Sequence, residues 1–505
     1  MNFINTHLLS LILFTPSIAA VAMLFFPREE NKLHRWVALG ASLVPFVLSL
    51  IAWAQFKADQ PGFQFEETHV WYTALGSSLH LGVDGLSLTM VLLTTLLTPL
   101  AILASFTISD KVKAYMMLFL FLETGMLGVF MSLDLLVFFV FWEVGLVPMY
   151  FLINQWGSAN RNYASMKFLI YTMGGSLGLL LAIQLLGVLF KTYDLQTIIA
   201  NWSGYTEPIG GIPASTFKTI AFWAFVVAFA VKVPIWPFHT WLPDAHTEAP
   251  TAGSMILAGV LLKLGAYGFL RLILPLYPDE ARMFAGALAV LATAAIVFGA
   301  LAAYAQTDFK RLVAYSSVNH MGFVVLGIAA AGLAAETSDA TIALNGAILQ
   351  MFNHGLSAAG MFFLVGVIYE RTHTRNLEEF GGLFPLVPIY GGILIFTSMA
   401  SLGLPGLNGF ISEFLVVRGT WPILTGYTAL SMVGLLFTGA YILKGIKKVL
   451  HGPMNEHWAH GEHRLTEINA REILVMAPLM ALILWIGIYP AWILDVINKA
   501  VVMLF

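Results

Sequence analysis

Titratable side chains lie inside long apolar stretches of this sequence, and they are the residues whose types and spacing point most directly to chemistry. The seven are Glu123, Glu143, Lys232, Lys263, His320, His354 and Glu413. A charged side chain near the centre of a lipid bilayer costs about 2.5 to 3.5 kcal/mol, so such residues usually have partners or line a wet path. Imidazoles that titrate near neutral pH are suited to relay protons. The series therefore predicts a proton path.

The stretch VKVPIWP places Lys232 two residues before Pro234 in the middle of an apolar segment. Proline cannot donate a backbone hydrogen bond and interrupts the helical ladder, so we expect the helix to open beside the lysine and admit water. Glu143, in FFVFWEVGLVP, is the expected partner of this amine. Movement of the carboxylate toward or away from Lys232 would then load or unload a proton.

Each of these groups also has a purely structural interpretation. A single buried Glu–Lys pair often only ties two helices together. Glu123 could satisfy a neighbouring helix, and His320 and His354 could be hydrogen-bonded packing residues. A series of six or seven groups is harder to explain as structural support, because each member carries its own insertion penalty. The sequence therefore favours a proton path and ranks Glu123 below the other members.

The elements that must position these residues are membrane-spanning helices. Of 505 residues, 59% are hydrophobic and 10% are charged, whereas roughly a quarter are charged in soluble proteins. Apolar stretches of about 20 residues, long enough to cross a bilayer, recur fourteen times. Their expected limits are 5–26, 34–55, 84–107, 113–131, 134–155, 163–190, 215–238, 253–275, 282–304, 313–332, 341–369, 387–419, 425–449 and 470–490. The sequence thus predicts an all-α polytopic membrane protein.

No segment between these spans is long enough for a separate soluble domain. The longest polar interruptions are 56–82, 191–214 and 450–469, well below typical domain size. Residues 1–505 are therefore expected to form one membrane domain. Loops after odd-numbered spans hold sixteen Lys and Arg, and loops after even-numbered spans hold six. By the positive-inside rule, both termini are expected on the outer side.

Two spans share an unusual interruption. Span seven is broken by VKVPIWP, and span twelve by SLGLPGLNGFISEF. Broken helices at corresponding positions point to an inverted repeat, because freed backbone groups are tolerated in a membrane only where protein or water satisfies them. We expect one repeat at 113–275 (spans four to eight) and a second at 282–449 (spans nine to thirteen). Residues 1–107 and 470–505 would supply flanking helices.

Other motifs point to no cofactor or metal in this chain. The sequence has no cysteine, which excludes thiolate-bound clusters, and the net charge of −3 gives no reason to expect nucleic acid. His457, His460 and His463 have helical spacing in a charged loop, where a solvated surface is the favoured interpretation over a metal site. The segment GGSLG, residues 174–178, predicts close helix packing.

Four longer segments resemble a known family: FFVFWEVGLVPMYFLI, FAVKVPIWPFHTWLPDAHTEAPTAGSMILAGVLLKLGAYG, QTDFKRLVAYSSVNHMGF and FNHGLSAAGMFFLVGVIYERTHTR. Together they are similar to the antiporter-like membrane subunits of respiratory complex I, over nearly the whole chain. The resemblance implies fourteen core helices, two inverted five-helix repeats and proton translocation in the inner (plasma) membrane of a bacterium. It also implies that NADH, FMN, iron–sulfur clusters and quinone are bound by partner subunits, and that neighbouring antiporter-like chains are the direct partners.

The same resemblance assigns roles to individual residues. It places the family's glutamate of span five at Glu143, its two lysines at Lys232 and Lys263, its central histidines at His320 and His354, and its carboxylate of span twelve at Glu413. A subunit of a multi-subunit Na⁺/H⁺ antiporter, with the same fold, is the main alternative. Glu413 favours complex I, because the antiporter chains resemble one another in having lysine there. A scaffold that has lost transport is a second alternative, which the intact charge series disfavours.

Overall fold

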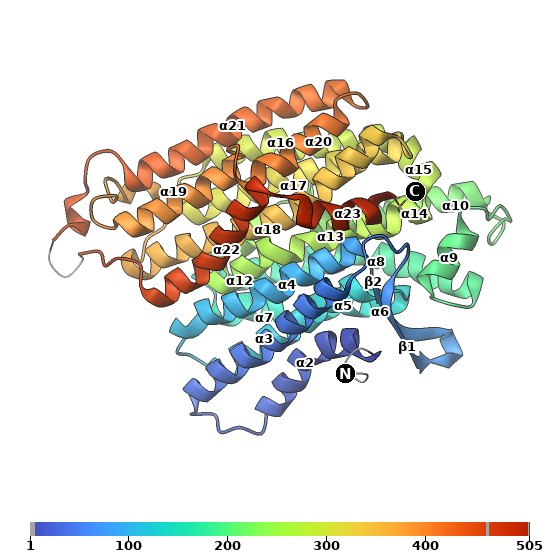
Figure 1. Ribbon diagram of the computed structural model, residues 1–505, viewed down its shortest axis with the longest axis horizontal. Coiled ribbons are helices and arrows are strands. Elements are labelled where there is room, and N and C mark those ends of the chain that lie inside the picture. The colour runs from blue at the N-terminus through green and yellow to red at the C-terminus, as the bar shows by residue number, and fades with distance from the viewer. Residues whose placement is uncertain (1–5, 461–463, 503, 505) are drawn as a thin grey trace.

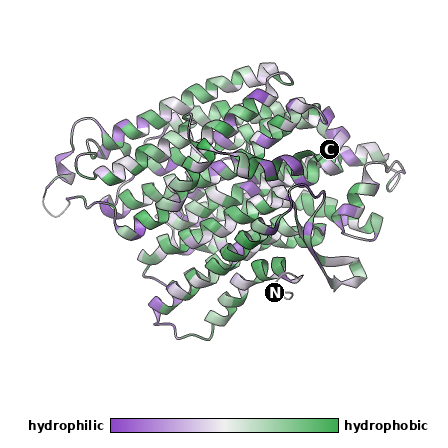
Figure 2. Ribbon diagram, in the orientation of Figure 1, coloured by the Kyte–Doolittle hydropathy of each residue, from purple (hydrophilic) through white to green (hydrophobic). Residues whose placement is uncertain are grey.

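The computed structural model describes residues 6–460, 464–502 and 504, and helices make up most of it. The helices lie side by side along one direction and form a bundle (Figure 1). Hydrophobic residues dominate the helices, and hydrophilic residues gather in the connections at the two ends of the bundle (Figure 2). The predicted helical membrane architecture is therefore confirmed.

The first part of the chain contains a β-hairpin between long helices. Its elements are α2 (Leu8–Met23), α3 (Asn31–Gln55), β1 (Gln64–Tyr72), β2 (Ser77–Val83), α4 (Gly85–Ala104), α5 (Val112–Met131), α6 (Leu135–Val144), α7 (Leu146–Trp156), α8 (Arg161–Phe190) and α9 (Leu195–Trp202). The last part is wholly helical, apart from its connections. Its helices are α19 (Pro388–Leu402), α20 (Asn408–Thr420), α21 (Thr425–Leu450), α22 (Ala470–Ile488) and α23 (Ala491–Val502).

The middle part of the chain holds the interrupted helices. Its elements are α10 (Ala214–Lys232), α11 (Trp241–Glu248), α12 (Thr251–Ile256), η3 (Leu257–Leu261), α13 (Leu262–Gly268), η4 (Phe269–Ile273), α14 (Leu274–Leu276), α15 (Pro278–Met283), α16 (Ala285–Ala305), α17 (Phe309–Leu333) and α18 (Ser338–Thr372). Two of these elements, η3 and η4, are π-helical turns within one continuous helix. Such π-turns are rare and occur frequently at functional sites, and the sequence pattern did not predict them.

Twelve helices within the described residues are long and apolar enough to cross a membrane. They coincide with twelve of the fourteen predicted spans. The spans predicted at 5–26 and 387–419 coincide with shorter apolar helices, α2 and α19, and α20 continues the second after a break. Residue 5 lies outside the described residues. The total of fourteen and the two inverted repeats therefore stay predictions.

The polar interruption at 56–82 folds into the β-hairpin. Strands β1 and β2 pair antiparallel, and Gly76 between them has a φ of 70°, a left-handed conformation that glycine adopts without steric cost. The hairpin lies at the same end of the bundle as the start of α2 and the end of α23, while the connection between α21 and α22 lies at the opposite end (Figure 1). The first and the last described helices therefore have their outer ends on the same side as the hairpin.

The two predicted breaks occur where the sequence placed them. Helix α10 ends at Lys232, and the chain resumes helical form only at Trp241. Helix α19 ends at Leu402, the following residue Gly403 has a φ of 82°, and α20 starts at Asn408. Each break frees backbone groups from the helical ladder. At the first break, the indole of Trp241 donates a 2.8 Å hydrogen bond to the carbonyl of Val231.

The GGSLG segment mediates close packing, although not at its first residue. A Cβ at Gly175 would lie 3.1 Å from Val231, and one at Gly178 would lie 3.1 Å from Ala224. A Cβ at Gly174 would meet no atom within 4 Å. The small residues that let α8 approach α10 are therefore Gly175 and Gly178, three residues apart.

Candidate functional site

Four of the predicted residues form a buried chain of two hydrogen-bonded pairs inside the bundle. Lys263 comes from α13, His320 from α17, His354 from α18 and Glu413 from α20. Each is at most 5% exposed. These positions are far apart in sequence, so packing of the helices brings them together.

Lys263 and His354 form the first half of this chain. The ammonium group of Lys263 lies 2.8 Å from Nδ1 of His354 and also donates to the carbonyl oxygen of Ala258 in the π-turn η3. Because an ammonium group only donates, Nδ1 of His354 is the acceptor. The hydrogen on its Nε2 then points to the hydroxyl of Ser317, 3.2 Å away.

His320 and Glu413 form the second half. Nδ1 of His320 lies 2.7 Å from Oε1 of Glu413, and the ring centroids of His320 and His354 are 5.6 Å apart. That gap between the imidazoles is the one step of the series without a direct hydrogen bond within the described residues. It is short enough for a small rotation of either ring or one water molecule to bridge it.

Polar side chains that the sequence analysis missed complete this network. The amide of Gln350 donates to Oε1 of Glu413 at 3.1 Å, and the hydroxyl of Ser412 donates to Gln350 at 2.5 Å. The hydroxyl of Tyr441 lies 3.3 Å from Nε2 of His320, and Asn353 donates to Ser412 at 3.0 Å. A polar residue at helical spacing within apolar spans is the signal that could have identified them.

Lys232 lies apart from this chain, and its expected partner is not in direct contact. Its ammonium group sits 4.6 Å from the ring centroid of Trp142, a cation–π distance. Within the described residues, no ion pair joins Lys232 to Glu143. Glu143 is half-buried and lies one residue before Val144, the last residue of α6. Although it makes no ion pair with Lys232, it is close enough to act on it electrostatically. The expected movement of this carboxylate toward and away from Lys232 therefore stays a prediction.

Glu123 stands alone in α5. Its side chain is fully buried, and neither carboxylate oxygen has a hydrogen-bond partner within the described structure. A buried ionised carboxylate without a partner is costly, so this carboxyl group is expected to be protonated. The structure does not bring Glu123 into the Lys263–Glu413 chain.

A cavity with several charged residues in its lining lies at the end of the bundle opposite the hairpin. It has a volume of about 160 Å³ and is lined by residues that include Glu248, Lys310 and Arg375. Lys310, which the sequence placed in a loop, is 6% exposed and donates to the carbonyl of Ala249. His246 lies between this cavity and the central chain and is fully buried. Neither of its ring nitrogens has a hydrogen bond within the described residues. Lys310 and Lys263 are both close enough to act on it electrostatically.

The three histidines of the loop at 450–469 have surface environments where they are described. Nε2 of His460 lies 3.3 Å from Glu456, and both side chains are more than three-quarters exposed. The ring of His457 packs edge-on against Trp458 at 4.5 Å. His463 lies outside the described residues.

The sequence family follows from residues 132–440, which match the family model described as NADH:quinone oxidoreductase/Mrp antiporter, TM. The matched region contains six of the seven predicted residues, all but Glu123. The chain belongs to this family. Among its members, the glutamate at position 413 favours the complex I subunits over the antiporter chains, as the resemblance implied.

Individual relatives confirm that assignment within the family. The chain is 40% identical to NADH-quinone oxidoreductase subunit M of Rhodobacter capsulatus, with 98% of this chain and 96% of the relative covered. A chain of the solved structure titled respiratory complex I from Thermus thermophilus with bound NADH has a TM-score of 0.84 and 26% identity, and covers 98% of this chain and 99% of that one. The antiporter-like fold is therefore confirmed for this family member.

A chain of the Mrp complex from Dietzia sp. DQ12-45-1b has the same fold. Its TM-score is 0.82 at 24% identity, and the match covers 98% of this chain but 52% of that one. At this level of identity the likeness shows the fold alone. The family member described here therefore shares its architecture with antiporter subunits, while its nearly full-length match at 40% identity is to subunit M.

Proposed function

We propose that this chain translocates protons across the inner membrane of a bacterium as the subunit M of an NADH:quinone oxidoreductase. The observation that carries the proposal is the buried chain from Lys263 through His354 and His320 to Glu413. Its groups can each gain and lose a proton, and they lie within one hydrogen bond or one bridging water of each other. The relatives named subunit M support the assignment of the whole complex.

The route runs from the cavity lined by Glu248 and Lys310 to Glu413. Protons enter beside Glu248 and Lys310, pass His246 and reach Lys263. They then cross the two imidazoles to Glu413 and leave toward the end of the bundle that carries the hairpin. Moving one charge against 100 mV requires about 2.3 kcal/mol, so each transfer must be driven by a change elsewhere in the complex.

Lys232 and Glu143 set the charge state near the start of this route. The end of α10 at Lys232 frees backbone groups where water can approach, and Trp142 holds the ammonium group by its ring face. Because Glu143 lies beside the α6–α7 junction, a shift of that junction changes its distance to Lys232. Lys232 retains its proton when the Glu143 carboxylate is near and releases the proton when the carboxylate moves away.

The distribution of Lys and Arg among the connections, taken with the fold, supports one orientation of the chain in the membrane. The connections after odd-numbered spans carry the excess of Lys and Arg and so face the cytoplasm. The hairpin and both chain ends, on the opposite side (Figure 1), then face the periplasm. The segments 113–275 and 282–449 are the two inverted repeats, each with one broken helix.

The driving energy comes from partner subunits. NADH, FMN, iron–sulfur clusters and quinone are expected there, and the adjacent antiporter-like membrane chains transmit the change to this one. In this chain the residues only hold and move protons. A Na⁺/H⁺ antiporter subunit is the alternative function, and it predicts transport that requires Na⁺ and proceeds without NADH.

The decisive experiment removes the central amine. Lys263→Met, expressed in the complete complex in membrane vesicles, should lower NADH-driven proton pumping by about two orders of magnitude, the scale of a positioned proton-transfer group. Lys447→Met, in the exposed face of α21, is the control and should pump normally. Wild-type pumping in an assembled Lys263→Met complex would refute the proposed route, and pumping that requires Na⁺ would favour the antiporter.

A further inference from the structure

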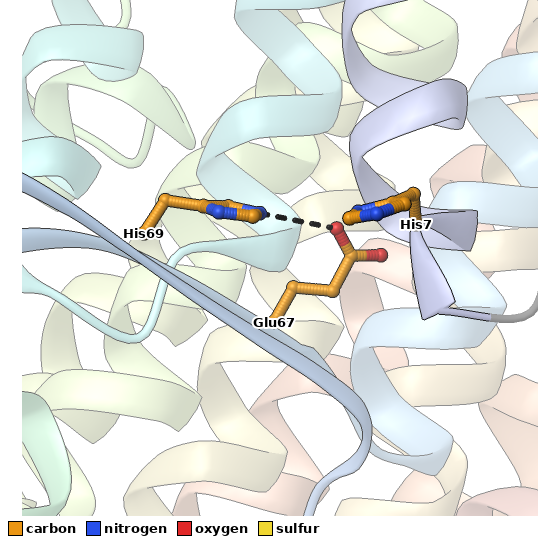
Figure 3. Close-up of side chains that lie close together, drawn as sticks. All are labelled: His7, Glu67 and His69. Carbon is orange, nitrogen blue, oxygen red and sulfur yellow. Dashed lines mark ion pairs between the residues drawn. The ribbon is translucent and has the colours of Figure 1, made fainter. Parts of the chain in front are cut away.

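Three metal-ligating side chains converge away from the proton route, at the end of the bundle that carries the hairpin. They are His7, just before α2, and Glu67 and His69 on β1. One potential ligand atom from each lies within 4.8 Å of the others. Figure 3 shows the two imidazoles approaching the Glu67 carboxylate from its two sides.

The local backbone explains why these residues meet. Glu67 and His69 are two positions apart on one strand, so their side chains lie on the same face of the hairpin. Nε2 of His69 lies 3.8 Å from Oε2 of Glu67. The ring of His7 is tilted by only 22° from that of His69, with centroids 6.0 Å apart. The first helix and the hairpin thus present their donors to one point.

The carboxylate between the two rings is fixed in place. Glu67 is 6% exposed and accepts the backbone N–H of Leu9 at 2.7 Å, together with the N–H and hydroxyl of Ser10. Hydrogen bonds of this kind orient carboxylate ligands in metal sites. Capping of the first turn of α2 would be a sufficient role for Glu67 alone. It does not explain why an imidazole lies on each side of the Glu67 carboxylate.

The donor set selects the class of metal. Two imidazoles and one carboxylate match the three-ligand zinc sites that keep a fourth position open, whereas Ca²⁺ and Mg²⁺ prefer oxygen ligands alone. Bonds of about 2.0 to 2.2 Å in a tetrahedron place ligand atoms about 3.4 Å apart. The observed 3.8 Å between His69 and Glu67 needs only a small movement of His69, whose side chain is 46% exposed.

We propose that His7, Glu67 and His69 bind a divalent transition metal, Zn²⁺ in particular, and that the ion clamps β1 to the start of α2. Sequence reasoning predicted no metal site in this chain, because the ligands are separated by about sixty residues and follow no metal-binding spacing. The clamp is independent of the proton route, which lies in other helices.

Titration of the full-length chain in detergent with ZnCl₂, after treatment with a chelator, tests this site. Loss of one imidazole in His69→Ala should weaken Zn²⁺ binding by more than tenfold, since even second-shell changes cost about 10- to 100-fold. Zn²⁺ should also raise the melting temperature of the wild type but not of His69→Ala. His69 is exposed, so its replacement leaves the fold intact, and His7→Ala provides a second variant.

The competing source of Zn²⁺ binding is the histidine-rich loop at 450–469. His460→Ala, in that loop, should bind Zn²⁺ with wild-type affinity if the proposal holds. Equal affinities of the wild type and His69→Ala, or loss of binding in His460→Ala alone, would overturn it.

Discussion

Nδ1 of His320 and Oε1 of Glu413 lie 2.7 Å apart, although the residues are separated by 93 positions in the chain. Both side chains are at most 6% exposed, so neither can exchange its partner for water at the surface. The amide of Gln350 donates to the same carboxylate oxygen, and Tyr441 faces the other nitrogen of the imidazole. A proton that arrives at His320 therefore has Glu413 as its nearest acceptor.

Replacement of Glu413 by glutamine tests this relationship. Glutamine keeps the size of the side chain and an oxygen that can accept from His320, but it cannot bind and release a proton. NADH-driven pumping by the assembled complex should fall by about two orders of magnitude, measured as acidification of membrane vesicles. Glu378→Gln, at an exposed ion pair with Lys448, should leave pumping unchanged, and normal pumping by Glu413→Gln would remove Glu413 from the route.

Close packing of Gly265 against the end of α10 yields a second prediction. A Cβ there would lie 2.8 Å from the carbonyl oxygen of Phe229 and 2.9 Å from the backbone nitrogen of Val233, both beside Lys232. Backbone atoms cannot rotate away, so Gly265→Ala should destabilise the chain by about 1 to 3 kcal/mol. Thermal unfolding of the full-length chain in detergent measures the effect.

The control for this prediction is a glycine in open space. Gly174→Ala meets no atom within 4 Å, and alanine in place of a helical glycine gains up to about 1 kcal/mol. The two variants should therefore shift the melting temperature in opposite directions. A Gly265→Ala chain as stable as the wild type would show that α10 and α13 do not pack as closely as described.

Much of the candidate site was predictable, because burying a charge in a membrane segment leaves a strong signal in the sequence. Lys263, His320, His354 and Glu413 were identified in this way. Which group contacts which was not predictable: Lys263 pairs with His354, while Lys232 and Glu143 form no ion pair within the described residues. Pairing depends on the rotation and depth of each helix, which packing between distant segments determines.

Features of the fold that depend on local backbone chemistry were predictable, and features that depend on distant contacts were not. The breaks at Lys232 and Gly403 follow from local backbone chemistry, namely a proline and a glycine, and both were predicted. The π-turns around Lys263 and the β-hairpin depend on neighbouring elements and were missed. Arg271 is another feature that was missed, because its burial depends on its contacts with Asp84 and Ser87 at the start of α4.

Arg271 forms an ion pair with Asp84 that the sequence did not suggest. The atoms lie 2.6 Å apart, and both side chains are at most 8% exposed. Asp84→Asn keeps a residue that can cap α4 but leaves the guanidinium group unpaired, and breaking a buried pair costs about 3 to 5 kcal/mol. We expect a large fall in the melting temperature of the full-length chain.

An exposed pair supplies the comparison for Asp84→Asn. Arg418 and Asp339 lie 2.8 Å apart with side chains 53% and 31% exposed, and such pairs contribute about 0 to 1 kcal/mol. Arg418→Gln should therefore change the melting temperature little. Similar shifts for the two variants would contradict the importance of burial at Asp84.

His80 on β2 makes the stability of the hairpin depend on pH. Its Nδ1 lies 2.9 Å from Asp194, before α9, and its Nε2 lies 3.0 Å from Glu66. The hydrogen bond to Asp194 is the main cause that raises the pKa of His80 above its ordinary value, against the lowering effect of burial. Partial burial acts to raise the pKa of Asp194, but hydrogen bonds from His80 and Thr197 outweigh it and lower that pKa.

These opposite shifts define the pH window in which the contact between the hairpin and α9 is strongest. The contribution of His80 is complete below its unfolded pKa of about 6.5 and is lost as pH rises through its higher folded pKa. That of Asp194 is present above its unfolded pKa of about 3.9 and is lost as pH falls through its lower folded pKa. The difference in melting temperature between the wild type and His80→Gln should therefore be largest near pH 5 to 6 and shrink at higher pH. His460→Gln, at an exposed contact, should show no such trend, and a pH-independent difference for His80→Gln would mean that the imidazole is not charged in the folded protein.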